Sequence, residues 1–515
     1  MILKIMLTVL VCATAFAGEL VIADDKSSLR VLYIGDDPEN IVFHGLEQGM
    51  ADNERYIEIR KKRTSAYARF LRRYFDEVKV VFSGDYVESM SAGYDVTIFG
   101  NLPPLLRKVA MERDSDGHVT KIIPAVYLSE NYDRATIMIG DTSAIMGESL
   151  ELKIDWHCWC LYAHAHDMKL DHPIFNQPLP VEPTIVDRPT PWSYPQFYNG
   201  RNLPESMPMW RVQKESPHDE KGFPPGMVST GSGFVEAPDA EVISHGENTK
   251  ERESVALGRH GNFFLWGFIS DPDDMTDEAR RVFVNTVHYM ADYNGHTTPS
   301  RRTRLNWPRD KALDAVFAMQ QVSYEDWSTM QQKMFDLQKN GVLQRQQGGE
   351  QLSFADRRIL AKDGPELMDR ETWLATEAVA RQPESIVKLL GTDLQKYLPY
   401  YVENFEYLRP TEEFAVFEVD EDAKFLGTSN RAPESLQHWI NALNTEQDAE
   451  RARRLLGRYT SESFTNPSEW QSWYDSNVDR IYFSGVYTYK FEVIPEAEWT
   501  IIQNTLAQVK QESQK

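Results

Sequence analysis

Short segments made almost entirely of apolar residues recur through the first half of this chain, and stretches with helical spacing of apolar residues lie between them. A strand that is apolar on both faces must be covered on both faces, as in a parallel sheet between two layers of helices. The pattern therefore predicts an α/β fold with a mostly parallel sheet. The expected strands are residues 29–35, 78–82, 94–100, 135–140, 158–166 and 262–268, and the expected helices are residues 63–75, 143–152 and 276–293.

Residues 173–240 interrupt this pattern. They are rich in proline, glycine and tryptophan and show little periodicity, so we expect a long loop insertion. Such a loop in a compact domain is either a functional lid or an excursion along the surface. Residues 296–310 carry four arginines and are expected to form a linker, either a strap across an acidic surface or a binding patch.

The second half of the chain, residues 311–515, has a different character and predicts a mainly α-helical region. Its one clear strand pattern is residues 414–419, and aromatic residues such as Trp439 and Trp470 are expected in its core. The expected helices are residues 310–339, 365–390, 434–443, 447–459 and 467–477, and the other expected core aromatics are Trp473, Tyr474 and Phe483.

The N-terminal segment has the layout of a secretory signal peptide. Lys4 precedes an apolar stretch, and Ala15-Phe16-Ala17 resembles a cleavage site, so residues 1–17 predict export. Cys12 follows Val11, where a lipid-anchor signal would have a small residue, and no later apolar run reaches the roughly 18 residues of a membrane span. The localisation expected is periplasmic or extracellular.

The charge of the chain excludes some partners. With 55 basic and 78 acidic residues the formal net charge is −23. A field of that sign repels phosphate backbones and anionic membrane surfaces, so we expect no nucleic-acid partner. No G-x-G-x-x-G follows a strand and no Walker loop is present, so we expect no cofactor.

The turn after residues 135–140 is the position where many α/β enzymes place a nucleophile. It reads Gly140-Asp141-Thr142-Ser143-Ala144, with neither a cysteine nor a G-x-S-x-G motif. Asp141 suits the N-cap of the following helix, and this is the role that we expect for it. Thr142 or Ser143 would need a neighbouring base to act as a nucleophile, and the sequence does not identify one.

These features resemble one known family. The order of the strands, the Gly35-Asp36-Asp37 loop, the strand at residues 94–100 and the Gly258-Arg259-His260-Gly261-Asn262 segment are similar to the ThuA-like branch of the class I glutamine amidotransferase-like superfamily, over residues 29–295. The resemblance implies a flavodoxin-like sandwich and an association with sugar utilisation. The missing cysteine nucleophile contradicts glutamine hydrolysis.

A group of cysteines and histidines between residues 157 and 172 raises the question of a metal site. On one strand, the side chains from Cys158 to His166 would spread over about 26 Å at ~3.3 Å per residue, too far for one zinc ion. At most His164 and His166 could act together, with help from His172 or His260, and we expect no metal. A disulfide between Cys158 and Cys160 is conceivable and lies near the limit of its reach.

Polar residues follow several of the expected strands and could converge at one edge of the sheet. Asp36, Asp37, Asn101 and Asp141 are such residues, as are Asp271, Asp273 and Asp274. They could bind sugar hydroxyls or act as acid and base, although aspartate is also the commonest turn former. In the insertion, Trp192 and Tyr194 could stack on a sugar ring or pin the loop to the body.

Three functions remain open. The first is binding of a small ligand, such as a carbohydrate, at the carboxyl edge of the sheet. The second is a hydrolase that uses aspartate, serine or threonine there, with or without a metal, and it requires a pocket joining Asp36, Asn101, Asp141 and His260 and a perturbed carboxylate. The third is a scaffold that recognises a protein partner, and it requires an exposed apolar patch within residues 311–515.

Overall fold

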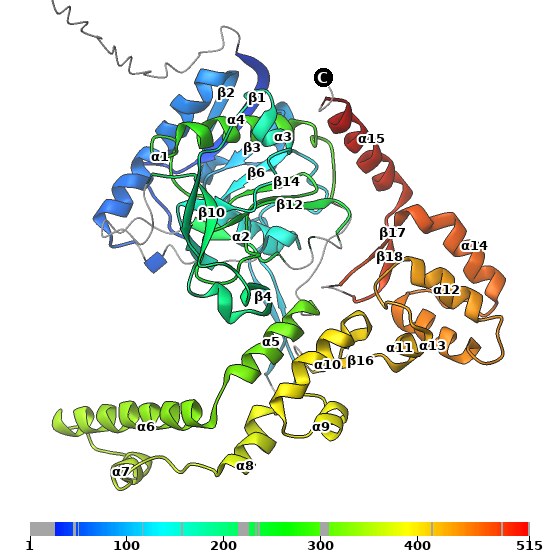
Figure 1. Cartoon of the computed structure of the whole chain (residues 1–515). Helices are drawn as coiled ribbons and strands as arrows, with labels where there is room; N and C mark the ends of the chain where they lie inside the picture. The colour runs from blue at the N-terminus through cyan, green and yellow to red at the C-terminus, as the bar shows by residue number, and fades with distance from the viewer. Residues whose placement is uncertain are drawn as a thin grey trace, which may run out of the picture.

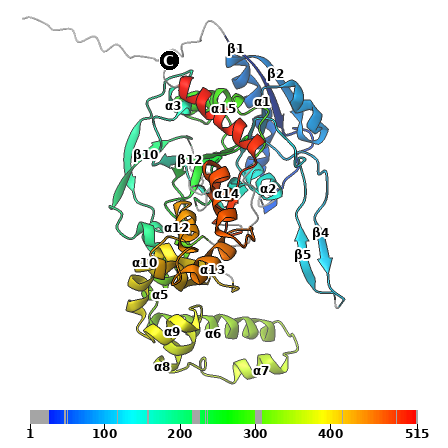
Figure 2. The same ribbon diagram turned by 90° about the vertical axis from the view of Figure 1, so that its right-hand side faces the viewer.

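The computed structural model has an α/β domain at one end and a mainly helical region that runs below and beside it (Figures 1 and 2). The structure describes residues 26–512 except 45–47, 50, 116, 156–157, 215–225, 232–233, 235–236, 299–307, 414–415 and 486–487. The expected signal peptide and most of the expected linker lie outside the described residues. None of the described helices combines the length and the apolar character needed to cross a bilayer.

The α/β domain is built on one ten-stranded sheet, in the order β2-β1-β3-β6-β14-β13-β12-β8-β10-β9. The first five strands are parallel and the rest join antiparallel. In chain order the parallel strands run 2-1-3-4-5, which is the flavodoxin-like order. The α/β fold and parallel core are confirmed. The strands are β1 (Ser27–Gly35), β2 (Phe75–Phe82), β3 (Val96–Phe99), β6 (Thr136–Ile139), β14 (Phe263–Trp266), β13 (Val255–His260), β12 (Ala240–Gly246), β8 (His164–His166), β10 (Ser206–Arg211) and β9 (Ile185–Pro189).

Both faces of the parallel core are covered, as the apolar strands require. Alternate residues of β1 point to opposite faces: Val31 and Tyr33 pack in one buried cluster, and Leu32 and Ile34 in another. The helices α1 (Glu54–Tyr74) and α4 (Asp277–Ala291) cover the first face, and α2 (Asp141–Ser149) covers the second.

The expected loop insertion is more regular than its composition predicted. It contains the short helix α3 (Pro173–Asn176), and β9 and β10 pair with each other to extend the main sheet. The expected strand at residues 158–166 is two strands: β8 belongs to the main sheet, and β7 (Cys158–Leu161) pairs with β11 (Gly226–Val228). The hairpin β4 (Ala110–Arg113) and β5 (Val119–Ile123) was not predicted.

The helical region has its own core, and it contains the expected aromatics: Trp439, Trp470 and Phe483 are buried, and Trp473 and Tyr474 pack against them. The expected helix 310–339 is two helices, α5 and α6. Two two-stranded sheets, β15–β16 and β17–β18, lie among the helices. The elements are α5 (Asp310–Gln321), α6 (Tyr324–Gln347), α7 (Phe354–Leu360), α8 (Arg370–Trp373), α9 (Glu384–Leu390), α10 (Tyr397–Glu403), β15 (Leu408–Pro410), β16 (Phe417–Val419), α11 (Glu421–Leu426), α12 (Glu434–Ala442), α13 (Ala449–Tyr459), α14 (Pro467–Asn477), β17 (Ile481–Phe483), β18 (Phe491–Val493) and α15 (Glu496–Glu512).

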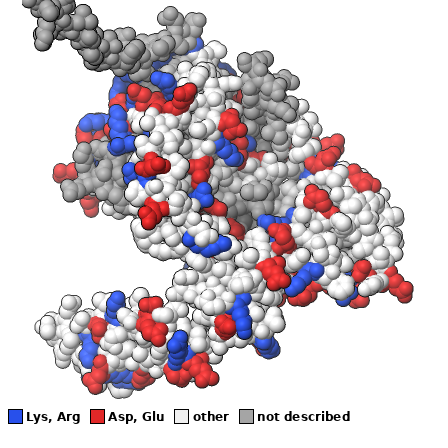
Figure 3. Space-filling view, viewed as in Figure 1, with Lys and Arg blue, Asp and Glu red and all other residues white. Residues whose placement is uncertain are grey.

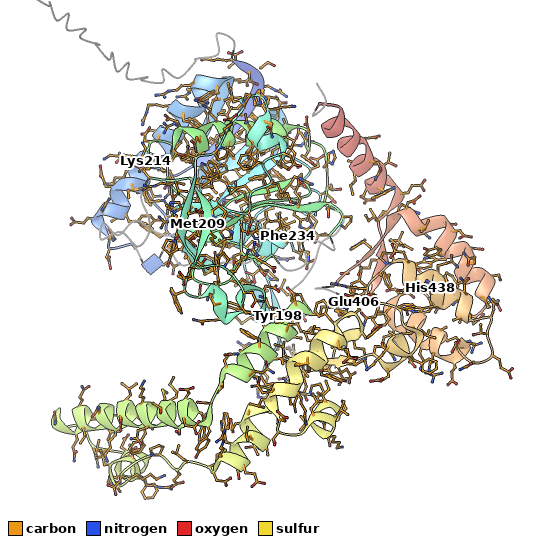
Figure 4. The ribbon with its side chains drawn as sticks, in the orientation of Figure 1. Tyr198, Met209, Lys214, Phe234, Glu406 and His438 are labelled. Carbon is orange, nitrogen blue, oxygen red and sulfur yellow. A yellow bond between two sulfur atoms is a disulfide. The ribbon has the colours of Figure 1, made fainter. Side chains whose placement is uncertain are left out.

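The start of α5 joins the two regions. The backbone N–H of Tyr198 donates to the Asp314 carboxylate over 3.0 Å, and Lys311 binds both Asp314 and Glu251 (Figure 4). Arg309, the one arginine of the expected linker that the structure describes, is buried and donates to the Phe405 carbonyl over 2.8 Å. This arginine therefore acts in packing rather than in a surface patch.

Gly140 lies in the tight turn between β6 and α2, and a substitution there tests whether this turn requires a glycine. Its φ is +56°, and an added Cβ would lie 2.2 Å from Cγ2 of Ile269. We expect Gly140→Ala to lower the free energy of unfolding by about 1–3 kcal/mol, through backbone strain and overpacking. Gly457→Ala in α13, where a Cβ meets open space, should instead raise it by about 0.5–1 kcal/mol. Urea unfolding of both variants checks this, and equal effects would contradict it.

Candidate functional site

The carboxyl ends of the parallel strands carry most of the polar residues that the sequence singled out. Asp36 follows β1, Asn101 follows β3, Asp141 follows β6, and Asp271 comes shortly after β14. The chain leaves β1 toward β2 on one side and enters β3 on the other, so β1 and β3 flank the topological switch point of the sheet. Doubly wound folds bind ligands in the crevice at this point.

Asp36 and Asn101 meet at the switch point, but the Asp36 carboxylate is already engaged. Nε of Arg60 donates to its Oδ2 over 2.7 Å, a second guanidinium nitrogen donates to its Oδ1 over 2.5 Å, and the Asn101 amide donates to the same Oδ1 over 2.7 Å. Asp36 and Arg60 are each only 1% exposed. The pair therefore fixes the loop after β1 to α1, and Asp36 positions the edge rather than facing a ligand.

A chain of buried polar groups leads from the switch point toward β14. The Tyr33 ring stacks on Tyr67, whose hydroxyl donates to the Ser270 carbonyl over 3.3 Å. The Ser270 hydroxyl in turn donates to Oε1 of Gln213 over 2.5 Å. Within the described residues, the Tyr33 hydroxyl and Nε2 of Gln213 are buried and have no hydrogen-bond partner. Buried polar atoms of this kind ordinarily bind water or a ligand.

A groove of about 630 Å³ lies between α1 and the loop after β14, and we call it the α1 groove. Asp271 lines it and is itself only 7% exposed. Burial raises the pKa of the Asp271 carboxyl, and the Asp273 backbone N–H, which donates to Asp271 over 2.9 Å, and the charge of Arg63 lower it only in part. The residues that line the α1 groove are Arg55, Glu58, Ile59, Lys62, Ser65, Arg69, Asp271, Asp273 and Asp274.

The residues considered as nucleophiles at the turn after β6 hold the turn together. The expected N-cap role of Asp141 is wrong, because Gly140 is the N-cap of α2 and Asp141 is the first residue of the helix. The buried Thr142 hydroxyl donates to the Ile139 carbonyl over 3.0 Å, and the buried Ser143 hydroxyl donates to the Ile154 carbonyl over 2.7 Å. No base accepts either proton, so these contacts are structural.

His260 lies at the opposite edge of the sheet from Asp36. It ends β13, which is antiparallel to β14, and pairs with Phe263 at the start of β14. Its Nδ1 accepts the Lys153 backbone N–H over 2.9 Å, and its Nε2 lies 3.4 Å from Asp239. A single pocket joining Asp36, Asn101, Asp141 and His260 is therefore wrong, because the direction of β13 carries the histidine to the amino edge.

The aromatic candidates lie at the far end of the sheet, beside β9 and β10. Trp192 is 72% exposed. Tyr194 is fully buried: its hydroxyl lies 2.9 Å from Nε2 of His166 and donates to the Gly246 carbonyl over 3.1 Å. Tyr194 therefore pins its loop to the body. Asp37 accepts the Glu39 N–H over 3.0 Å and shapes a turn.

The histidines considered as metal ligands each face a different carboxylate. His164 lies 2.8 Å from Glu247, His166 3.1 Å from Asp167, and His172 3.5 Å from Glu241. The described residues contain no group of three or more His, Cys, Asp or Glu that could hold a metal ion. Cys158 and Cys160 form a disulfide, with their Cα atoms 5.4 Å apart.

Sequence reasoning missed the two arginines beneath the carboxyl edge, and a signal for them exists. Tyr56, Arg60, Arg63 and Tyr67 are spaced four, three and four residues apart, and all four are buried on one face of α1. The helix was expected to begin at residue 63, whereas α1 begins at Glu54. If the expected helix had been extended by two turns toward the N-terminus, its apolar face would have included Arg60 and Arg63, which indicates two buried charges.

The Arg60–Asp36 pair can be tested by removing one partner. We expect Arg60→Met to lower the free energy of unfolding by about 3–5 kcal/mol, because Asp36 is left as a buried unpaired charge. Arg30→Met is the matched control. The Arg30–Asp95 pair is exposed, so its loss should lower the free energy of unfolding much less. Equal losses in urea unfolding would show that burial does not set the strength of the Asp36 pair.

The raised pKa of Asp271 predicts that the free energy of unfolding depends on pH. A raised pKa means that the folded state binds the proton more tightly than the unfolded state, so the carboxyl destabilises the fold as pH rises. Asp271→Asn should raise the free energy of unfolding at pH 7, and the gain should vanish below about pH 3.5, where both states are protonated. Unfolding curves at both pH values check this. Asp187→Asn, at an exposed position on β9, should leave the free energy of unfolding unchanged at both pH values.

Comparison with protein-family models, curated proteins and solved structures found no match for this chain. The fold is therefore described by its own topology, an α/β domain with a ten-stranded mixed sheet and parallel core, followed by a helical region.

Proposed function

We propose that the α/β domain binds a small, neutral, hydroxyl-rich ligand of the carbohydrate class in the α1 groove. The observation that carries this proposal is the place of Asp271, which lines the groove at the carboxyl edge and interacts electrostatically with the buried Arg63. The groove opens at the carboxyl edge, the edge at which doubly wound sheets bind ligands, beside α1 and the loop after β14 rather than at the β1–β3 switch point. The ThuA-like resemblance, with its association with sugars, agrees with this class.

The charges around the groove favour a neutral ligand. The lining contains three basic side chains and four carboxylates, and four of these form two surface pairs: Arg69 with Asp273 over 2.9 Å and Lys62 with Glu58 over 2.9 Å. A strongly charged ligand of either sign would meet like charges there. A hydroxyl both donates and accepts, so neighbouring hydroxyls of a sugar can use Lys62 or Arg55 as donors and Asp271 as an acceptor.

The proposal includes the cellular location. We propose that the protein is exported, on the signal-peptide pattern of residues 1–17. The ligand would then be met outside the cytoplasm.

Saturation-transfer NMR with glucose, galactose, maltose and trehalose as probes tests the binding. We expect transfer from the protein to at least one sugar and its loss in Asp271→Asn, while Asp187→Asn retains it. Because Asp271→Asn is expected to be as stable as the parent at pH 7 or more so, loss of transfer would not reflect unfolding. Absence of transfer to every probe, or equal transfer to both variants, would overturn the proposal.

A hydrolase is the second candidate, favoured by the raised pKa of Asp271. A carboxyl of this kind can act as a general acid, and Asp273 and Asp274 line the same groove. Prolonged incubation of the disaccharides in the same samples should then release monosaccharide, and the release should fall in Asp271→Asn. Binding without release would leave a binding protein and exclude hydrolysis of those sugars.

A further inference from the structure

The helix α6 projects from the body of the molecule (Figure 1), and three large apolar side chains on one of its faces are exposed to solvent. It has 24 residues, and only Phe335 and Val342 are buried. Met330, Met334 and Leu337 are 55%, 57% and 69% exposed, and we call these three the α6 stripe. Large apolar side chains at such exposure on one helix face mark an interaction surface.

The spacing of the stripe is that of a helix–helix seam. Its residues are four and three positions apart, as in the a and d positions of a coiled coil. Gly341 comes four residues after Leu337 and continues the same face. A Cβ added there would meet open space, so no contact among the residues that the structure describes explains a glycine, which is unfavourable inside a helix. A glycine on a seam leaves room for a large side chain of a facing helix.

The charges on α6 indicate which direction a facing helix would take. Asp326 lies in its first turn and Arg345 in its last, and by helical spacing both flank the α6 stripe; Arg345 also pairs with Asp356 of α7 over 2.5 Å. Two copies placed antiparallel bring the acidic end of each beside the basic end of the other, and they also oppose the helix dipoles favourably. Figure 3 shows both signs of charge on the projecting lobe that contains α6.

We propose that α6 is a homodimer interface, in which the α6 stripes of two copies of this chain pack antiparallel about a two-fold axis. Met334 of each copy then faces Leu337 of the other, and Met330 fills the space over the partner's Gly341. The same helix supplies both the large and the small residue and both signs of charge, which is the self-complementarity that a two-fold interface requires. One helix face makes a small interface, so the dimer should dissociate on dilution.

Sedimentation velocity over a wide concentration range tests the oligomeric state of the full chain. The parent protein should form dimers at high concentration, and Leu337→Glu should raise the dissociation constant at least about tenfold, since it places like charges on the seam. Thr329→Glu is the matched control, because it adds the same charge to α6 away from the stripe and should leave the constant unchanged. A parent that stays monomeric, or a dimer that Leu337→Glu does not weaken, would overturn the proposal.

Disulfide trapping tests the direction of pairing. In the antiparallel arrangement, Met330→Cys combined with Gly341→Cys should give a cross-linked dimer under mild oxidation, whereas Met330→Cys alone should not. The two positions are 11 residues apart on one helix, about 16 Å, so they cannot bridge within a chain. Cross-linking by Met330→Cys alone would indicate parallel pairing, and failure of the double variant to cross-link would also contradict the arrangement.

Discussion

The buried ion pair between Asp36 and Arg60 is the interaction on which the carboxyl edge depends. It fastens the loop after β1 to α1, and Asn101 adds the end of β3 through the same carboxylate. Two charges at 1% exposure persist only when they are paired and hydrogen-bonded. The α1 groove has α1 as one wall, so its shape follows from this pair although neither residue lines it.

The strands of the parallel core could be predicted because most of their residues are apolar and buried. β1, β3, β6 and β14 are runs of buried apolar residues, and each lies within a residue or two of the expected range. The antiparallel strands were not predictable in the same way. β13 is fully buried but reads Val-Ala-Leu-Gly-Arg-His. Arg259 is accommodated by partners from other segments: its Nε donates to Glu241 of β12 over 2.7 Å, and its Nη1 donates to the Asp239 carbonyl over 2.9 Å. Such a tertiary partner is invisible in the local pattern.

The candidate site was predictable in part for a related reason. Asp36, Asn101 and Asp271 follow strands whose direction the α/β pattern determines, so their convergence at one edge could be expected. His260 could not be placed, since its strand returns against the direction of β14. Arg63 and Gln213 required knowledge of which face of α1, and which part of the insertion, lies beneath the edge. The chemistry of the site therefore depends on long-range packing more than on any motif.

The α1 groove and the α6 stripe lie far apart, so one can bind a ligand while the other binds a second copy of the chain. The α1 groove belongs to the α/β domain, whereas α6 projects from the opposite end of the molecule in both views (Figures 1 and 2). None of the residues that line the α1 groove belongs to α6, so the proposed dimer contact and the groove use separate surfaces. Two binding sites carried on one two-fold particle would raise the effective affinity for a ligand that presents repeated units, such as a polysaccharide, without any new contact in either groove. The helical region would then contribute to binding by setting the number and spacing of the grooves.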